Sequence, residues 1–101
     1  MTNKPLQPIN VPSIEALETA HPFPTQYTIK VIGPDSLEFR SNAKTCCHNH
    51  LGQGVDIGVT ERQSKTGQHL ALTLKFEVPS AKMVQEIYKE LAQLQGLKFI
   101  I

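Results

Sequence analysis

Two thiols and two imidazoles stand close together in the middle of the chain, in the segment Cys46-Cys47-His48-Asn49-His50. Both groups bind zinc, which needs three or four ligands in a tetrahedral arrangement. On a helix, Cys46 and His50 lie one turn apart and could share an ion, whereas the residues between them point elsewhere. A third ligand would have to come from another part of the chain. We therefore interpret the cysteines as small core residues and the histidines as residues near a helix C-terminus, and we predict no metal site.

Nucleophilic or redox chemistry at Cys46 and Cys47 needs a lowered thiol pKa, which a helix N-terminus or a neighbouring cation provides. The two residues fall instead in the last turns of a predicted helix, where the helix dipole acts in the opposite direction. Gly52 and Gly54 precede a predicted strand, so they do not form a phosphate loop that opens a helix. No Ser-His-Asp order, HExxH motif or paired-carboxylate motif is present. We predict that the protein is not an enzyme and has no catalytic residue and no cofactor.

Gly33, Pro34 and Asp35 form the candidate ligand-binding site. They turn the chain from a predicted strand into a predicted helix, and the free amides at a helix start can bind an amino acid or another small anion. Glycine at position 33 allows the backbone to approach a ligand closely. Asp35 is expected to cap the helix, with Glu38 at the capping-box position. The alternative is a tight turn that binds nothing.

The elements that position these residues follow from the spacing of apolar side chains. Alternation predicts strands at residues 26–33, 55–59, 70–78 and 97–101, with a polar turn over residues 62–68. A helical stripe predicts a first helix from Ser36 to about His50, and a second helix that Ser80 caps and Gly96 terminates. The two stripes consist of Leu37, Phe39, Ala43, Cys46, Cys47 and Leu51, and of Val84, Ile87, Tyr88, Leu91 and Leu94.

The order β-α-β-β-α-β predicts an α+β fold, the ferredoxin-like two-layer sandwich. In this fold both helices cover one face of a four-stranded antiparallel sheet, and the first and third strands lie in its centre. We assign this domain to residues 22–101. Residues 1–21 are expected to form a flexible tail, because Pro5, Pro8 and Pro12 disfavour regular structure. Within the tail, Ser13 can cap one short helical turn.

The sheet face that the helices leave open offers a second candidate site. Ile32, Ala71 and Ile100 should be neighbours there if the first and last strands pair, forming a small apolar surface for a partner or a second copy of the chain. An RNA-recognition sheet would expose aromatic residues on its two central strands. The outward positions of those strands carry no aromatic residue, so we predict no nucleic-acid binding. Isolated surface isoleucines without a role are the alternative.

Composition points to one ordinary globular domain. The 101 residues are 40% hydrophobic and 19% charged, with a formal net charge of +1, whereas nucleic-acid binders usually carry a strong basic excess. The N-terminus lacks the apolar run of a secretory signal, and no stretch of the sequence is long and apolar enough to span a membrane. Two unpaired thiols suit a reducing compartment. We predict a cytoplasmic protein with no membrane contact.

A set of residues spread over positions 23–101 resembles the YbeD-like family of small bacterial proteins. The matching residues are Phe23-Pro24-Thr25, Lys30-Val31-Ile32-Gly33, Ser64, Gly67, the strand Leu70–Val78, Val84, Ile87, Tyr88, Leu91 and a histidine at His50. His69, where the family usually has an aromatic residue, and the polar first helix depart from the pattern. The resemblance implies the ferredoxin-like fold, a similarity to ACT regulatory domains and a proposed role as a lipoate regulatory protein. It implies no catalytic residues.

Two hypotheses of function remain open at this point. The first is a regulatory or adaptor domain that contacts a protein of lipoate or amino-acid metabolism, with a homodimer through an edge strand as one form of that contact. The second is an ACT-like sensor that holds a small amino or carboxylic acid near Gly33–Asp35. The sequence alone does not choose between them.

Overall fold

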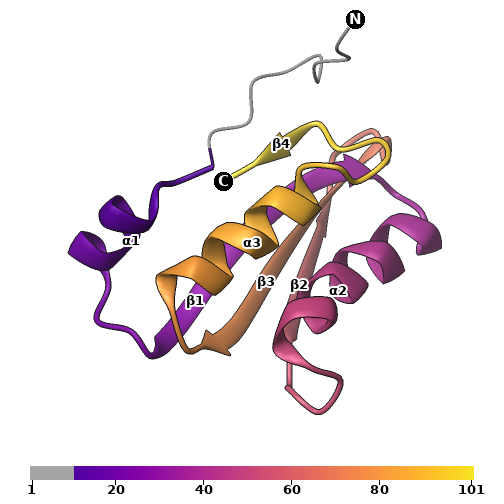
Figure 1. Ribbon diagram of the computed structural model, residues 1–101. Helices are drawn as coiled ribbons and strands as arrows, with labels where there is room; N and C mark the ends of the chain where they lie inside the picture. Colours follow the sequence, from indigo (N-terminus) through magenta and orange to yellow (C-terminus); the bar gives the residue numbers. More distant parts are fainter. Residues whose placement is uncertain (1–10) are drawn as a thin grey trace, which may run out of the picture.

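The computed structural model describes residues 11–101, and these form one antiparallel sheet and three helices. Their order along the chain is α1 (Ile14–Ala20), β1 (Thr25–Pro34), α2 (Leu37–Leu51), β2 (Gly58–Gln63), β3 (His69–Val78), α3 (Ala81–Leu91) and β4 (Phe99–Ile100) (Figure 1). The strand order is β2-β3-β1-β4. β1 and β3 therefore lie in the centre, and the predicted ferredoxin-like fold is confirmed.

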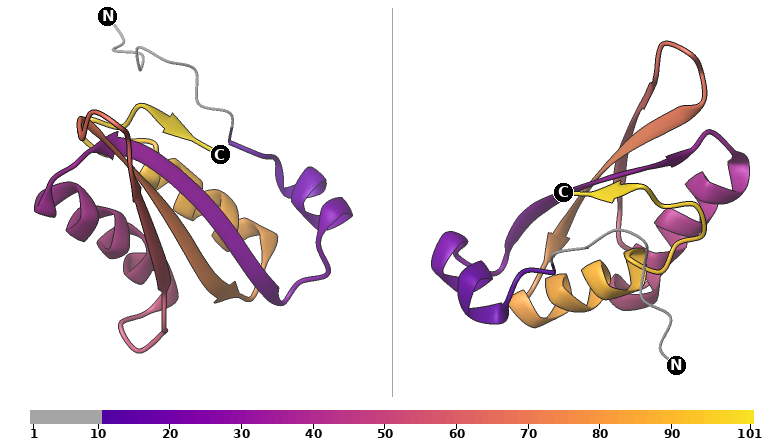
Figure 2. Two further views of the ribbon diagram at one scale, coloured as in Figure 1. Left: turned by 180° about the vertical axis from the view of Figure 1, so that it is seen from behind. Right: turned by 90° about the horizontal axis from the view of Figure 1, so that it is seen from above.

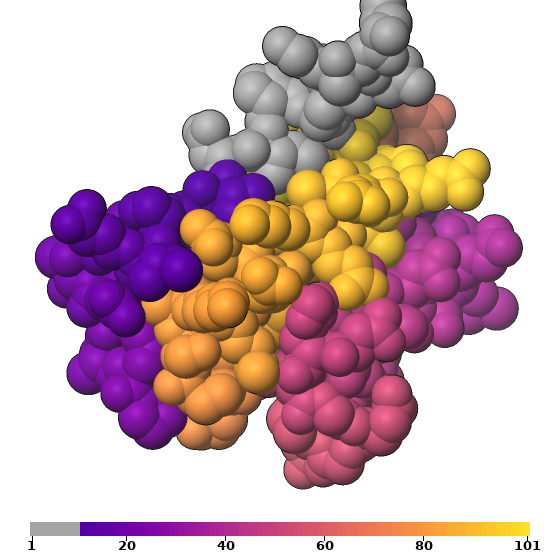
Figure 3. Space-filling view, viewed as in Figure 1, coloured from indigo at the N-terminus to yellow at the C-terminus, as the bar shows by residue number. Residues whose placement is uncertain are grey.

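The sheet and the helices form two layers (Figure 2). All three helices lie on one face of the sheet, side by side in the order α1, α3, α2 (Figure 3). The core fills the space between the layers, and Leu72, Leu74 and Val84 are fully buried in it. The opposite face of the sheet carries no helix, as predicted.

β1 and β3 are paired over their whole lengths, from Thr25 opposite Val78 to Pro34 opposite His69. The alternation of apolar and polar residues predicts which face each side chain takes, because successive side chains of a strand point to opposite faces. Ile29 and Val31 face the helices and are fully buried. Thr28, which precedes them, and Lys30, which lies between them, are exposed.

β2 lies further along the chain than predicted. It begins at Gly58 and continues to Gln63, so that Arg62 and Gln63, expected in the turn, belong to the strand. Val55 and Ile57 are half-buried but have no partner in the ladder. Alternation reports which side chains are buried, and here it continues through an unpaired loop in which Ile57 packs against the core.

Helix α2 contains most of the predicted apolar stripe, but Leu37 is 82% exposed and does not belong to it. Phe39, Ala43, Cys46 and Cys47 face the core. The expected Asp35 cap is wrong, and the capping-box pair with Glu38 fails with it. The helix is instead capped by Ser36, whose Oγ accepts a hydrogen bond of 3.1 Å from the backbone N–H of Phe39.

Helix α3 starts as predicted and ends earlier than predicted. Ser80 caps it through a 3.2 Å hydrogen bond from the N–H of Met83, and the apolar face from Val84 to Leu91 is buried. The helix stops at Leu91, and turns then lead to Gly96. Gly96 has a φ of 85°, and a Cβ there would lie 2.9 Å from the ring of Pro34. Glycine is thus required at this position for two reasons.

Helix α1 is more than the single turn predicted before the domain. Ser13 caps it, as expected, through a 3.1 Å hydrogen bond from the N–H of Ala16. Leu17 is only 3% exposed and packs into the common core, and α1 lies against α3. The rest of the predicted tail, residues 1–10, lies outside the described part of the chain.

Candidate functional site

The three residues of the predicted ligand site do not act together. Gly33 is buried against Phe39, and a Cβ at position 33 would lie 2.5 Å from two carbons of the Phe39 ring. The close approach that glycine allows is therefore taken by a side chain of the protein itself. Pro34 faces a surface hollow, and Asp35 points into an ion-pair network.

That network joins the start of α2 to β2. Asp35 Oδ1 lies 2.8 Å from Nη2 of Arg40, and the side-chain amide of Gln63 donates a hydrogen bond to Oδ2. Arg40 Nε in turn donates to Glu61 Oε2 at 2.8 Å. Because its carboxylate is occupied in this way, Asp35 neither caps the helix nor offers itself to a ligand.

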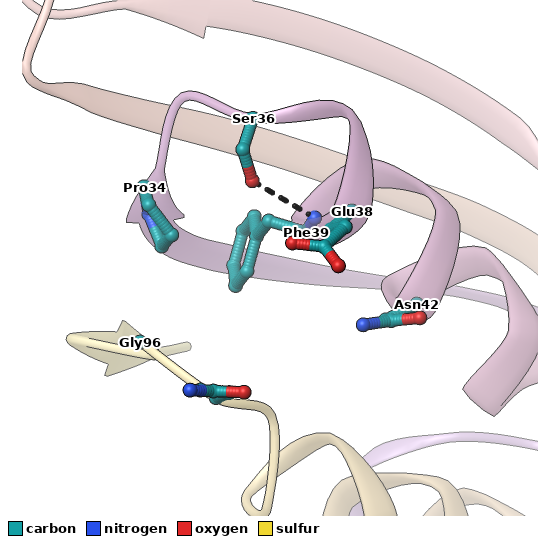
Figure 4. A pocket seen from close by; sticks show the side chains of 7 residues that line it. Pro34, Ser36, Glu38, Phe39, Asn42 and Gly96 are labelled. Carbon is teal, nitrogen blue, oxygen red and sulfur yellow. Dashed lines mark hydrogen bonds between the residues drawn. The ribbon is translucent and has the colours of Figure 1, made fainter.

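The hollow beside Pro34 has a volume of about 330 Å³. Figure 4 shows the Phe39 ring beside Pro34, with Glu38 and Asn42 on the adjoining turns of α2. The remaining lining residues are Ser36 and Gln95, so Glu38 is the one ionised group in the wall. The wall therefore suits a ligand that donates hydrogen bonds or carries a positive charge better than a simple anion.

The thiols and imidazoles of α2 have partners inside the protein. Burial, followed by the negative charge of Glu90, raises the pKa of both Cys46 and Cys47 to about 12. His50 Nε2 lies 2.7 Å from Oε1 of Glu90, which joins α2 to α3. His48 Nδ1 lies 2.9 Å from the carbonyl oxygen of Gly52. Thiols in such surroundings are poor nucleophiles.

Within residues 11–101, no three His, Cys, Asp or Glu side chains come together as a metal site would require. None of the helices described here is long and apolar enough to cross a membrane.

The open face of the sheet brings together residues from all four strands. Ile32 on β1 pairs with Ala71 on β3, as the sequence predicted. On its other side Ile32 pairs with Phe99, whereas Ile100 pairs with Val31 and packs against the core. The placement of Ile100 on this face is therefore wrong by one residue of register, and a shift of one residue moves a side chain to the opposite face.

Two further residues complete this surface. Ile101 exchanges both backbone hydrogen bonds with Lys30, at 3.2 and 2.9 Å, which places it opposite Lys30 and on the same face as Phe99. Phe99 is 60% exposed and Ile101 is 69% exposed. We call the four residues Ile32, Ala71, Phe99 and Ile101 the open-face patch.

A shallow hollow of about 240 Å³ adjoins the open-face patch. Ile32 and Ala71 form its apolar part, and its polar wall consists of Arg62, Gln63, Ser64 and His69. Arg62 stands on β2 opposite Ala71, so the row Arg62-Ala71-Ile32-Phe99 crosses the whole sheet. The sequence signalled that residues 97–101 form a strand, but not which of them face outward, because that depends on where the turns after α3 end.

The described fold is that of a small ferredoxin-like domain. A solved structure supports this class: the chain is similar to the ACT domain from the GTP pyrophosphokinase of Chlorobium tepidum, with a TM-score of 0.57 and 12% sequence identity. The match covers 75% of this chain and 94% of that domain.

The chain belongs to the family described as "Protein of unknown function (DUF493)", which matches residues 18–101. Two relatives carry the description "UPF0250 protein", one from Shewanella sediminis (strain HAW-EB3) and one from Shewanella piezotolerans (strain WP3 / JCM 13877). They are 27% and 25% identical over 79 residues, and each match covers 78% of this chain and 88% of the relative. The predicted resemblance to the YbeD-like proteins is confirmed.

Proposed function

We propose that the domain is a non-enzymatic regulatory or adaptor module, and that the open-face patch is the surface through which it contacts another protein. The exposure of Phe99 and Ile101 beside Ile32 on a helix-free face carries this proposal. Adjacent large apolar side chains in water gain free energy when a partner covers them. The similarity to an ACT domain from a GTP pyrophosphokinase is in keeping with a module that serves an enzyme without being one.

An affinity purification from the lysate of the organism that makes the protein tests this function. Three tagged forms serve as bait: the wild type, Phe99→Ser and Leu37→Ser. Leu37 is the matched control because it is also a large exposed side chain, 82% exposed, but lies on α2. We expect proteins that the wild type and Leu37→Ser retain equally and that Phe99→Ser loses. Enzymes of lipoate or amino-acid metabolism in the cytoplasm are the partners expected from the family resemblance.

If all three baits retain the same set of proteins, the result contradicts the proposal. A second copy of the chain is the other occupant to be tested. Light scattering coupled to size exclusion distinguishes it: a dimer that Phe99→Ser converts to a monomer would assign the open-face patch to self-association.

A second candidate function is an ACT-like sensor of a small amino or carboxylic acid. The hollow of about 330 Å³ beside Pro34 favours it, because that volume lies at the lower end of the range for small-molecule sites. An amino acid suits the wall better than octanoate or lipoate, since its ammonium group can pair with Glu38 while the amides of Asn42 and Gln95 bind its carboxylate.

A thermal-shift screen against amino acids, octanoate and lipoate tests the sensor. A ligand that binds the hollow should raise the melting temperature of the wild type and of Lys44→Ala, which does not line the hollow, but not that of Glu38→Gln. Asp35→Ala is unsuitable here, because it would break the ion pair with Arg40 whether or not a ligand binds. A shift that survives Glu38→Gln would place the ligand elsewhere.

A further inference from the structure

We propose that the partner segment that docks on the open-face patch is acidic, with carboxylates placed around one large apolar side chain. This inference rests on the proposed function and specifies the chemistry of the partner.

Charge is distributed unevenly over the molecule, and cations outnumber acidic side chains on the open face. The formal net charge is only +1. The strand residues that face away from the helices include the three cations Lys30, Arg62 and Lys75, and one acidic side chain, Glu77. None of these three cations has an ion pair within the described part of the chain. A surface of one sign attracts a partner of the opposite sign and selects against others.

Two acidic residues, Glu61 and Asp35, are engaged on the other side of the sheet. Glu61 and Asp35 pair with Arg40, between β2 and α2. Because Glu61 alternates with Arg62 along β2, its carboxylate points toward the helices while the guanidinium points away from them. Among the described residues, Lys30 and Arg62 thus have no acidic side chain in ion-pair contact, and Glu77 is the one acidic side chain that shares the open face with them.

The cations border the apolar residues in a regular way. The row Arg62-Ala71-Ile32-Phe99 crosses four strands, about 14 Å at the usual strand spacing. The neighbouring row is Thr60-Thr73-Lys30-Ile101, about 7 Å further along the strands. Ala71 and Ile32 therefore lie between two cations: Arg62 at the end of the first row, and Lys30 beside Ile32 in the second row. Apolar side chains bordered by charged ones are typical of a protein interface, which has an apolar centre and a polar rim.

The hollow next to this row fits a side chain of a protein better than a free small molecule. Its volume of about 240 Å³ is below the roughly 300–1,000 Å³ of typical small-molecule sites. Ile32 and Ala71 form its apolar part and Arg62 stands at its wall. An apolar side chain seated there would bring an adjacent carboxylate within reach of the guanidinium, which binds carboxylates through two parallel hydrogen bonds.

A nucleic acid is the other anionic macromolecule that a basic face could bind. Of the outward residues of the two central strands, His69 alone has a ring that could stack on a base, and it lies at the end of β3 next to the turn. The central strands therefore lack the set of stacking aromatic residues that an RNA-recognition sheet carries. The other outward residues, none of them aromatic, include Gln26, Thr28, Lys30 and Ile32 on β1, and Ala71, Thr73, Lys75 and Glu77 on β3. We therefore assign the surface to an acidic protein segment.

Selection of random peptides displayed on phage against the immobilised full chain provides the probe. We expect the enriched peptides to be acidic and to contain a large apolar residue. The most enriched peptide, made with a fluorescent label, is then titrated against the wild type and variants and followed by anisotropy. Lys30→Ala combined with Arg62→Ala should raise its Kd by at least about tenfold. Lys82→Ala combined with Lys89→Ala, two exposed cations on α3, should not change it.

Further outcomes separate this inference from the proposed function. Enriched peptides that are neutral or basic, and that bind the wild type but not Phe99→Ser, would overturn the acidic partner and leave the docking surface standing. Peptides whose binding neither Phe99→Ser nor the Lys30/Arg62 variant weakens, or the absence of any enriched peptide, would overturn both. Tighter binding of an oligouridylate than of the selected peptide, lost with Arg62→Ala, would assign the surface to nucleic acid and overturn the inference.

Discussion

At the scale of single residues, the glycine that seemed suited to ligand binding has a structural role. Gly33→Ala would place a Cβ 2.5 Å from the buried Phe39 ring, so the ring or the strand must move. Overpacking of this kind costs about 1–3 kcal/mol. We expect a loss of that size in the free energy of unfolding, measured in urea.

Gly58→Ala is the matched control for this substitution. Gly58 also lies in a strand, but its nearest contact to a new Cβ is 3.7 Å, an ordinary van der Waals distance. Equal stability of the two variants would contradict the tight packing of Gly33 on Phe39.

The cysteines predict a specific dependence of stability on pH. Burial raises the pKa of Cys46 and Cys47 from an ordinary 9.0 to about 12, with a smaller contribution from Glu90. The folded chain thus keeps protons that the unfolded chain releases above pH 9. Stability from this source is complete below pH 9 and is lost as the pH rises toward 12. Between pH 8 and 10 we expect a loss of about 1 kcal/mol per thiol.

Guanidinium unfolding at each pH measures this loss. The Cys46→Ala, Cys47→Ala double variant provides the comparison, because it lacks both thiols. Its stability should fall less over the same pH range than that of the wild type. An identical pH profile for the two proteins would show that the thiols ionise as readily in the folded chain as in the unfolded one.

At the scale of elements, the sequence predicts burial better than it predicts hydrogen-bonded partners. The apolar pattern correctly marks β1, β3 and α3, since period-2 and period-3.6 repeats follow from backbone geometry alone. The start of β2 and the outward residue of β4 depend on register, which the turns around them determine. Ile100 and Phe99 are adjacent in sequence, and only the pairing with β1 decides which one faces outward.

Competition between side chains explains the other errors in the elements. Asp35 and Ser36 are both good capping residues, and sequence preference does not separate them. The contacts of Asp35 with Arg40, five residues along the chain, and with Gln63 on β2 leave the cap to Ser36. Two residues of the turn site predicted at Gly33–Asp35 have partners within the chain: Gly33 packs on Phe39, and Asp35 pairs with Arg40.

Helix α1 offers a test of whether it belongs to the folded body. Leu17 is 3% exposed and in contact with the common core, so Leu17→Ala should lower the free energy of unfolding by about 2–4 kcal/mol. Leu37→Ala makes the same chemical change at a helical leucine that is 82% exposed, and should stay within about 0.5 kcal/mol of the wild type. Chemical unfolding followed by circular dichroism measures both. If Leu17→Ala leaves the free energy of unfolding unchanged, α1 does not contribute to the stability of the folded domain.

At the scale of the whole molecule, the two-layer fold is predictable because one repeat pattern determines each element and few topologies accommodate the order β-α-β-β-α-β. The same simplicity explains why function is harder to predict. A helix layer on one side leaves the other side of the sheet open in any protein of this fold, so the open face becomes informative only through the side chains on it. Here those are Phe99, Ile101 and the cations that have no ion pair within residues 11–101.

The asymmetry between the two sheet faces gives the last prediction. Leu74 is fully buried between the layers, and Leu74→Ala should cost about 2–5 kcal/mol of unfolding free energy. Phe99→Ser removes a larger side chain, yet Phe99 is 60% exposed on an edge strand, so its loss should cost less than about 1 kcal/mol. Guanidinium unfolding compares the two, and an amide NMR spectrum of Phe99→Ser should keep the wild-type dispersion. A Phe99→Ser variant as unstable as Leu74→Ala would mean that this face is part of the core, and the open-face patch could not then be a docking surface.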